Sequence, residues 1–307
     1  MVSTPAARWL VLASALLFST GGAAIKTEAF SAAQVSAVRS GIAAIVLVVY
    51  LVLVRRGRLK ISPGMLPAGV LYASTLTLFV AANKLTTAAN AIFLQAVAPL
   101  YILVLGPWTL GERWTSRDLA HVGALATGLA MCFFGQQAPS TSAPDPATGN
   151  LLASVAGVTW AGTLLFLRHL GKTHADDSGG LGAVIVGNAM AFLVAIPFAW
   201  PPPSASATAW ATVTYLGVFQ IGLAYVFFTR AIRQVSALEA SLLLLIEPVL
   251  NPMWAWLVHD ESPGAYTLAG GAVIVSATAL RAATAPRGQE ALRATAGTPP
   301  DRPSAER

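Results

Sequence analysis

Ten apolar runs, each close to the length of a membrane-spanning helix, follow one another along this chain. A helix that crosses the hydrocarbon core of a bilayer needs about 20 mostly apolar residues. The linkers between the runs are brief and rich in proline, glycine and serine. The predicted limits are Trp9–Ile25, Gln34–Val54, Met65–Ala82, Thr87–Trp108, Leu119–Gly135, Asn150–Leu167, Gly179–Trp200, Thr208–Thr229, Ser236–Val258 and Tyr266–Leu280. The sequence therefore predicts an all-α integral membrane protein with ten transmembrane helices, of which the third and fifth are short.

The composition supports this class and argues against soluble ones. Only 10% of the residues are charged, whereas soluble domains carry about 25%. The basic residues lie in short clusters between apolar runs and lack interleaved aromatic residues, so we expect no nucleic-acid partner. The single cysteine, Cys132, lies inside an apolar run, and the four histidines have no ligand spacing. We therefore expect no metal and no cofactor, and the chain has no phosphate-binding loop for ATP.

The distribution of basic residues predicts the orientation in the membrane, because cytoplasmic loops carry an excess of lysine and arginine. If both termini are cytoplasmic and ten spans alternate, all but three of the 19 basic residues lie on the cytoplasmic side. The exceptions are Lys26, Lys84 and Arg39. Arg39 lies one turn inside the second span, where we expect it to reach the headgroups.

Two halves of the chain resemble each other in sequence. Pro99 corresponds to Pro248, and Gly111-Glu112 corresponds to Asp260-Glu261. Because each half holds five spans, an odd number, the second half would enter the membrane inverted. Inverted repeats are typical of secondary transporters that bind substrate near the membrane midplane. The predicted units are a first repeat at 1–135, a periplasmic linker at 136–149, a second repeat at 150–281 and a disordered cytoplasmic tail at 282–307.

The ends of the repeats carry a family resemblance. In the fourth span, Pro99 precedes an apolar stretch that ends in Leu110-Gly111-Glu112-Arg113, and a glycine-rich span follows. In the ninth, Glu247-Pro248 precedes a stretch that ends in Asp260-Glu261-Ser262-Pro263. This pattern resembles the drug/metabolite transporter superfamily in its ten-helix, two-repeat EamA form. The resemblance implies alternating access, and the aromatic content of the spans is similar to the branch that exports amino acids.

We therefore expect a secondary transporter in a bacterial inner membrane. It would export small metabolites, namely amino acids including aromatic ones, and its partners would be the substrate and the bilayer. A carrier of a nucleobase or drug-like compound is an alternative. A membrane-embedded enzyme is less favoured, because Glu247 has no predicted catalytic partner, and the repeat argues against a receptor or scaffold.

Glu247 is the leading candidate for chemistry, because charge inside a membrane is costly. It lies near the middle of the ninth span, and we expect no basic residue at that depth, which argues against a highly anionic substrate. Two interpretations stay open. Glu247 either contacts a substrate amine or a coupled proton, or it is a hydrogen-bonded carboxyl group that stabilises a helix broken by proline.

Aromatic and amide side chains inside the spans complete a predicted pocket of the kind that binds small molecules. Tyr72, Phe79 and Asn83 share one face of the third span because of their spacing. The full set of predicted substrate-binding residues is Trp160, Tyr72, Phe79, Asn83, Gln95, Tyr101, Asn188, Tyr225 and Glu247. The alternative for each is packing between helices.

Three prolines are predicted hinges, because proline lacks the backbone N–H that closes a helical turn. Pro99 leaves the carbonyl of Gln95 without a donor, Pro248 does the same for Leu244, and Pro252 follows one turn later. Small residues at Gly123/Thr127 and Gly270/Ile274 permit close helix contact within the protein or in a homodimer. Glu112 and Glu261 are interpreted as residues of helix ends and gates.

Overall fold

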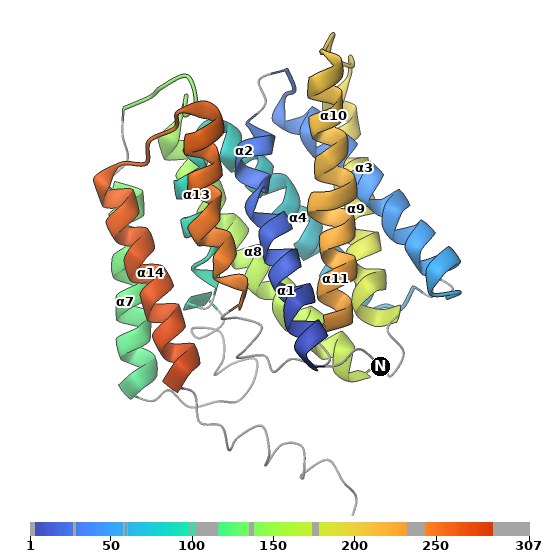
Figure 1. Cartoon of the computed structure of the whole chain (residues 1–307), viewed down its shortest axis with the longest axis horizontal. Coiled ribbons are helices and arrows are strands. Elements are labelled where there is room, and N and C mark those ends of the chain that lie inside the picture. Colours follow the sequence, from blue (N-terminus) through green and yellow to red (C-terminus); the bar gives the residue numbers. More distant parts are fainter. Residues whose placement is uncertain are drawn as a thin grey trace, which may run out of the picture.

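The computed structural model describes residues 4–26, 29–57, 59, 61–98, 100–101, 116–134, 138–173, 178–231 and 243–284. Its helices run side by side as one bundle (Figure 1), and the described residues contain no β-strand. The helices are α1 Thr4–Ser19, α2 Gly21–Ile25, α3 Ala32–Val49, η1 Tyr50–Val54, α4 Met65–Leu85, α5 Ala88–Gln95, α7 Ser116–Phe134, α8 Pro146–Thr173, α9 Ser178–Ala199, α10 Ala207–Tyr215, η2 Leu216–Leu223, α11 Ala224–Ala231, α13 Ile246–His259 and α14 Ala265–Thr284.

Six described helical stretches are long and apolar enough to cross a membrane, and two shorter apolar helices accompany them. This confirms the all-α membrane class. The third predicted span is longer than expected, because α4 continues through Asn83 and Lys84 to Leu85. The fifth predicted span lies in α7, which begins earlier, at Ser116, while the predicted end Gly135 lies outside the described residues. The fourth and ninth predicted spans are described only in part, as α5 and α13.

Several helix boundaries have a local chemical cause. The Ser31 side chain accepts from the backbone N–H of Gln34 and starts α3 with a capping box. Thr87 accepts from the N–H of Asn90 at the start of α5. Asp145 accepts from the N–H of Thr148 at the start of α8, so this helix begins inside the predicted linker 136–149. The predicted tail 282–307 begins as the end of α14, and its remainder lies outside the described residues.

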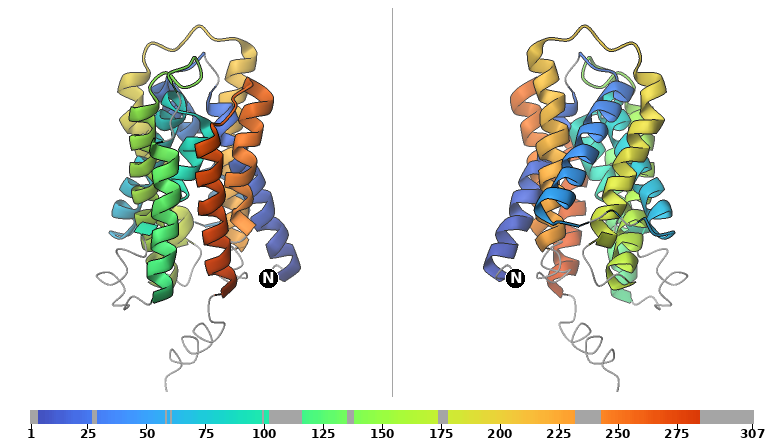
Figure 2. Two further views of the ribbon diagram at one scale, coloured as in Figure 1. Left: turned by 90° about the vertical axis from the view of Figure 1, so that its left-hand side faces the viewer. Right: turned by 90° about the vertical axis from the view of Figure 1, so that its right-hand side faces the viewer.

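The two predicted repeats are interleaved in space. Helix α4 packs against α8 and α9, and α3 packs against α9 and η2, so helices of one half contact helices of the other throughout the bundle. The start of α1 and the end of α14 lie at the same end of the bundle (Figure 2). The linker after α7 and the connection between α9 and α10 lie at the opposite end, called here the linker end.

Helices α7 and α14 form one edge of the bundle (Figure 1). A Cβ atom added to Gly270 would lie 2.7 Å from the Gly128 carbonyl oxygen, and one added to Gly128 would lie 2.8 Å from the Gly270 carbonyl oxygen. The small residues therefore serve close contact within the chain, at Gly128 and not at the predicted Gly123. A homodimer stays a prediction.

We expect Gly270→Val to lower the stability of the protein by about 1–3 kcal/mol, because a branched side chain forces α7 and α14 apart. The measurement is thermal unfolding of the purified chain in detergent. Gly123→Val is the matched control, since a Cβ atom there meets nothing within 4 Å. An equal loss of thermal stability in the two variants would contradict the role of Gly270 in helix packing.

Candidate functional site

Tyrosine side chains from two halves of the chain meet inside the bundle. The rings of Tyr72 in α4 and Tyr225 in α11 contact edge to face, with centroids 5.4 Å apart. Phe18 of α1 also packs against Tyr225, with ring centroids 5.1 Å apart. Trp160 of α8 is half-buried and packs against the same core cluster. The structure thus brings together three predicted site residues from three helices.

Unpaired polar atoms accompany these rings. Asn188 of α9 donates through Nδ2 to the carbonyl oxygen of Val184, 2.9 Å away, while its Oδ1 has no partner among the described residues. The Tyr72 hydroxyl lies close to Tyr225 and Asn188 but makes no hydrogen bond of normal geometry. Buried polar atoms are rarely left unpaired. A donor that approached Asn188 Oδ1 would therefore complete its hydrogen bonding.

Arg39 belongs to the same cluster, and the prediction that it reaches the headgroups is wrong. Its side chain is only 1% exposed. The Nη2 atom donates to the Leu76 carbonyl oxygen at 3.2 Å, and the guanidinium interacts electrostatically with Tyr72 and Tyr225. The reason is that α3 is packed between α9 and η2, so this face of α3 is turned into the bundle and away from lipid.

Glu247 lies half-buried in the first turn of α13. It interacts electrostatically with Tyr225, which also interacts with Arg39. That no basic residue lies at the depth of Glu247 in another span stays a prediction. We call Arg39, Tyr72, Asn188, Tyr225 and Glu247 the central cluster.

Trp160 borders the central cluster, and the other four predicted site residues lie outside it. Phe79 belongs to a separate apolar core with Phe93 of α5, and Asn83 donates to the Phe79 carbonyl oxygen within α4. Gln95 and Tyr101 border Gly157 of α8: a Cβ atom there would lie 3.2 Å from Tyr101 Cε2. Gly157 precedes Trp160 by about one helical turn. Gln95 and Tyr101 therefore approach the helix that carries Trp160.

The helices change course where the prolines predict it. Helix α5 ends at Gln95, whose carbonyl Pro99 cannot bond. Pro99 itself lies outside the described residues. A turn at Leu245 precedes α13, directly after Leu244, whose carbonyl Pro248 cannot bond. Pro252 is buried inside α13. Whether these positions act as hinges stays a prediction.

A buried ion pair lies at the linker end of the bundle. Lys26 Nζ is 2.7 Å from Glu261 Oε2, and the two side chains are only 4% and 2% exposed. Lys26 also donates to the carbonyl oxygens of Thr86, at 2.8 Å, and Ser142. Glu261 accepts from the backbone N–H of Ala88 at 2.6 Å. Burial lowers the pKa of Lys26, while the charge of Glu261 and its hydrogen bond oppose that shift.

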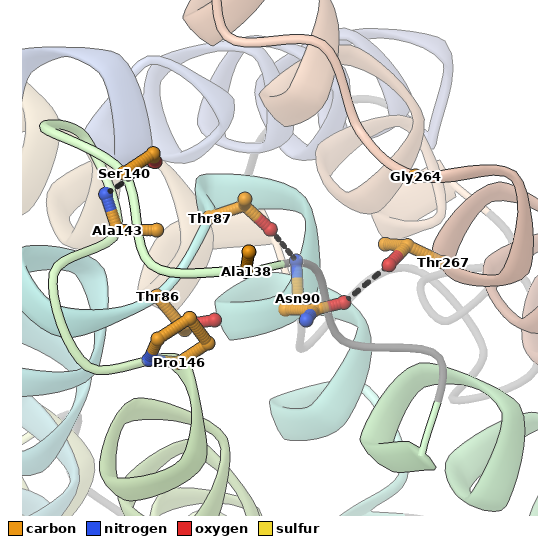
Figure 3. A pocket seen from close by; sticks show the side chains of 9 residues that line it. All are labelled: Thr86, Thr87, Asn90, Ala138, Ser140, Ala143, Pro146, Gly264 and Thr267. Atoms are coloured by element: carbon orange, nitrogen blue, oxygen red, sulfur yellow. Dashed lines mark hydrogen bonds between the residues drawn. The ribbon is translucent and has the colours of Figure 1, made fainter.

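Amide and hydroxyl groups extend this ion pair into a network. Asn150 Oδ1 accepts from Thr86 Oγ1 at 2.7 Å and from Asn90 Nδ2 at 3.1 Å. Asn90 Oδ1 in turn accepts from Thr267 Oγ1 at 2.8 Å (Figure 3). The cavity beside these side chains has a volume of about 10 Å³, which is room for roughly one water molecule. The side chains of the network therefore leave little free space between them.

The break between α1 and α2 is held by side chains from the second half. Trp254 of α13 donates to Ser19 Oγ at 3.0 Å, and Thr20 Oγ1 lies 3.1 Å from the Tyr215 hydroxyl oxygen. His259 Nε2 lies 2.8 Å from the Ala23 carbonyl oxygen. Asn251 is fully buried against Gly22. Helices α1, α2 and α13 are thus joined by polar contacts near the linker end.

Sequence reasoning missed the roles of Arg39, Asn90, Asn150 and Asn251. The available signal was a polar side chain within or beside an apolar run, which marks functional positions in membranes. Glu261 was assigned to a helix end or gate, without its partner Lys26. Among the described residues, no group of three or more histidine, cysteine or acidic side chains could hold a metal ion.

Comparison with known proteins identifies relatives along nearly the whole chain. Two proteins described as pseudopaline exporter CntI, from Pseudomonas aeruginosa strains UCBPP-PA14 and PAO1, are each 29% identical over 278 residues, which covers 87% of this chain and 93% of the relative. A solved crystal structure at 22% identity shares the fold, with a TM-score of 0.60, and covers 95% of this chain and 99% of that one. The EamA-like transporter family matches residues 6–134 and 147–282. The chain therefore belongs to the EamA-like transporter family.

Proposed function

We propose that this protein exports a small metabolite across a bacterial inner membrane by alternating access, with substrate bound at the central cluster. The observation that carries the proposal is the family match over both halves of the chain, and the similarity to two bacterial exporters supports the outward direction. The basic residues support cytoplasmic termini. The shared end of α1 and α14 would then face the cytoplasm, and the linker end would face the periplasm.

The packing of the helices supports an arrangement of two inverted repeats. Helix α4, in the third predicted span, packs on α8 and α9 of the sixth and seventh spans. In the corresponding way, the eighth span packs through α11 on α1 and through η2 on α3, in the first and second spans. An exchange of the two halves therefore maps these contacts onto each other, as expected for a pseudo-two-fold axis in the membrane plane.

The Lys26–Glu261 network supports a state closed toward the periplasm. It joins the end of the first span, the start of α5, the linker and the loop before α14. In an alternating-access cycle these contacts must separate to release substrate outward. We therefore assign Lys26 and Glu261 to the periplasmic gate, with the turn at Leu245 and the end of α5 as the hinge regions.

The central cluster supports substrates with an amine and an aromatic or apolar side chain, including aromatic amino acids. The carboxylate of Glu247 suits an ammonium group, and the faces of Tyr72, Tyr225 and Trp160 suit cations and rings. The unpaired Asn188 Oδ1 adds an acceptor. Tyr101 and the main chain of Gln95 lie against α8 about one turn before Trp160, whereas Phe79 belongs to the neighbouring apolar core.

Flux into proteoliposomes tests the proposed function. The purified full chain is reconstituted, and counterflow of labelled amino acids, nucleobases and drug-like amines is measured with and without a pH gradient. Protein-dependent equilibration of large apolar or aromatic amino acids is expected. Movement of only nucleobases or drug-like compounds would refute the amino-acid assignment, and no movement of any compound would refute the proposed transport.

We expect Trp160→Ala to lower the transport rate by about tenfold, because a large aromatic contact in a binding site carries much of the binding energy. Membrane insertion should stay unchanged, since Trp160 is only half-buried. The measurement is the initial counterflow rate, normalised to reconstituted protein. Trp210→Ala, at an exposed tryptophan of α10 that packs on Phe30, serves as the control. Unchanged kinetics in Trp160→Ala would remove this residue from the site.

A further inference from the structure

Arg39 is a buried charge for which the fold supplies no counter-charge among the described residues. It is the largest side chain that is fully buried. Its Nη2 atom donates to a main-chain carbonyl oxygen, that of Leu76, and Nε has no hydrogen-bond partner in the described part of the chain. Among the described residues, the buried ion pair is formed by Lys26 and Glu261. The guanidinium of Arg39 faces two neutral phenols instead.

Such an arrangement is unfavourable for the ligand-free protein. A charge removed from water is compensated only by a close opposite charge and by hydrogen bonds to its remaining donors. A neutral side chain of similar volume would pack against Tyr72 and Leu76 without this penalty. An anion bound beside the guanidinium would compensate the cost of burying its charge. The planar donor group of arginine can form two parallel hydrogen bonds with a carboxylate.

The surroundings of Arg39 indicate which anion fits. Tyr225 interacts electrostatically with both Arg39 and Glu247, so a basic and an acidic side chain lie near the same tyrosine. The Tyr72 hydroxyl and Asn188 Oδ1 are unpaired in the same region. A ligand that presents an ammonium to Glu247 would therefore place a second, anionic group toward Arg39. A small carboxylate satisfies this geometry without bringing further charge into the bundle.

We propose that Arg39 is the carboxylate-recognition residue of the substrate site, and that the transported molecule carries a carboxylate beside its amine. This inference rests on the proposed transport site at the central cluster and narrows its substrate class. Simple amines and neutral drug-like compounds would lack the group that compensates Arg39. The site would then select among substrates by their carboxylate charge as well as by their aromatic part.

Matched pairs of compounds test the inference by binding, without any need for transport. Thermal unfolding of the purified full chain is measured with L-phenylalanine, L-tryptophan and L-histidine. Each is compared with its decarboxylated amine: 2-phenylethylamine, tryptamine or histamine. The wild-type chain should be stabilised by at least one amino acid and much less by its amine. Arg39→Gln should raise the apparent dissociation constant of that amino acid by about tenfold or more, because a charged hydrogen bond is lost.

Three variants separate recognition from structure. Arg39→Lys keeps the charge but loses the planar donor group, so an intermediate loss of affinity is expected. Arg230→Gln, at an exposed arginine near the end of α11, removes the same charge elsewhere and should keep wild-type affinity. Arg39→Met should leave the ligand-free unfolding temperature unchanged or raise it, because an uncompensated charge is removed.

The inference is overturned if no amino acid of the panel stabilises the wild-type chain, or if the amines stabilise it equally. It is also overturned if Arg39→Gln keeps the preference for the carboxylate, or if Arg39→Met lowers the ligand-free unfolding temperature. These results concern binding and stability alone. Failure of the counterflow experiment would instead refute transport, so the two failures are distinguishable.

Discussion

Glu261→Gln is expected to destabilise the protein by about 3–5 kcal/mol, because it leaves a buried ammonium without its carboxylate. Lys26 would keep its bonds to the Thr86 and Ser142 carbonyl oxygens, but these do not compensate its charge. The same change should loosen the linker end, since Glu261 also accepts from the Ala88 N–H. Thermal unfolding in detergent measures the first effect.

Thiol labelling measures the second effect. In a background that carries Cys132→Ala, the side chain of Thr267 is replaced by cysteine, and labelling by a membrane-impermeant reagent is followed from the outside. Glu261→Gln should increase the labelling rate, because Thr267 lies beside the network that closes this end. The double variant Lys26→Met/Glu261→Gln should recover much of the lost stability, since no unpaired charge remains.

Asp260→Asn is the matched control for this pair of measurements. It makes the same carboxylate-to-amide change at the adjacent residue, which is exposed. Asp260 has a positive φ of 51°, and asparagine tolerates that conformation. Asp260→Asn should therefore behave as the wild type. A loss equal to that of Glu261→Gln, or no recovery in the double variant, would show that the ion pair does not close this end.

Glu247→Gln is expected to lower the transport rate by about tenfold to a hundredfold, because a charged hydrogen bond to a substrate ammonium is lost. The amide has nearly the same volume, so the unfolding temperature should change little. Counterflow is measured across a range of external pH, since a carboxylate that carries a proton during transport would also shape the pH profile. Full activity with the wild-type profile would assign Glu247 to the structure of α13.

The sequence predicted the course of the chain better than its internal contacts. Run length and the alternation of basic clusters located the membrane helices, because bilayer thickness and loop charge depend on local composition. The proline positions located the end of α5 and the turn before α13, since a missing N–H acts within one turn. Both kinds of inference use residues that are close together along the chain.

Arg39 and Lys26 show why the remaining contacts could not be predicted. The position of Arg39 along its span was clear, but whether it faced lipid or the bundle depended on how α3 packs against α9 and η2. Lys26 and Glu261 come from opposite ends of the sequence. Tyr72 and Phe79 share a buried face of α4, yet that face contacts two separate cores, so common helical spacing did not place them in one site.

The position of Glu261 in the chain also has a consequence for biosynthesis. Lys26 enters the membrane region with the first span, whereas Glu261 follows α13 and is made shortly before the last helix. Asn150 and Thr267, which form hydrogen bonds with Asn90, are likewise made later than Asn90. While the first half is being made, Lys26 therefore lacks its carboxylate and Asn90 lacks its side-chain partners. A chain that ends before residue 261 would keep the Lys26 ammonium without a carboxylate, so we expect it to be less stable than the full chain.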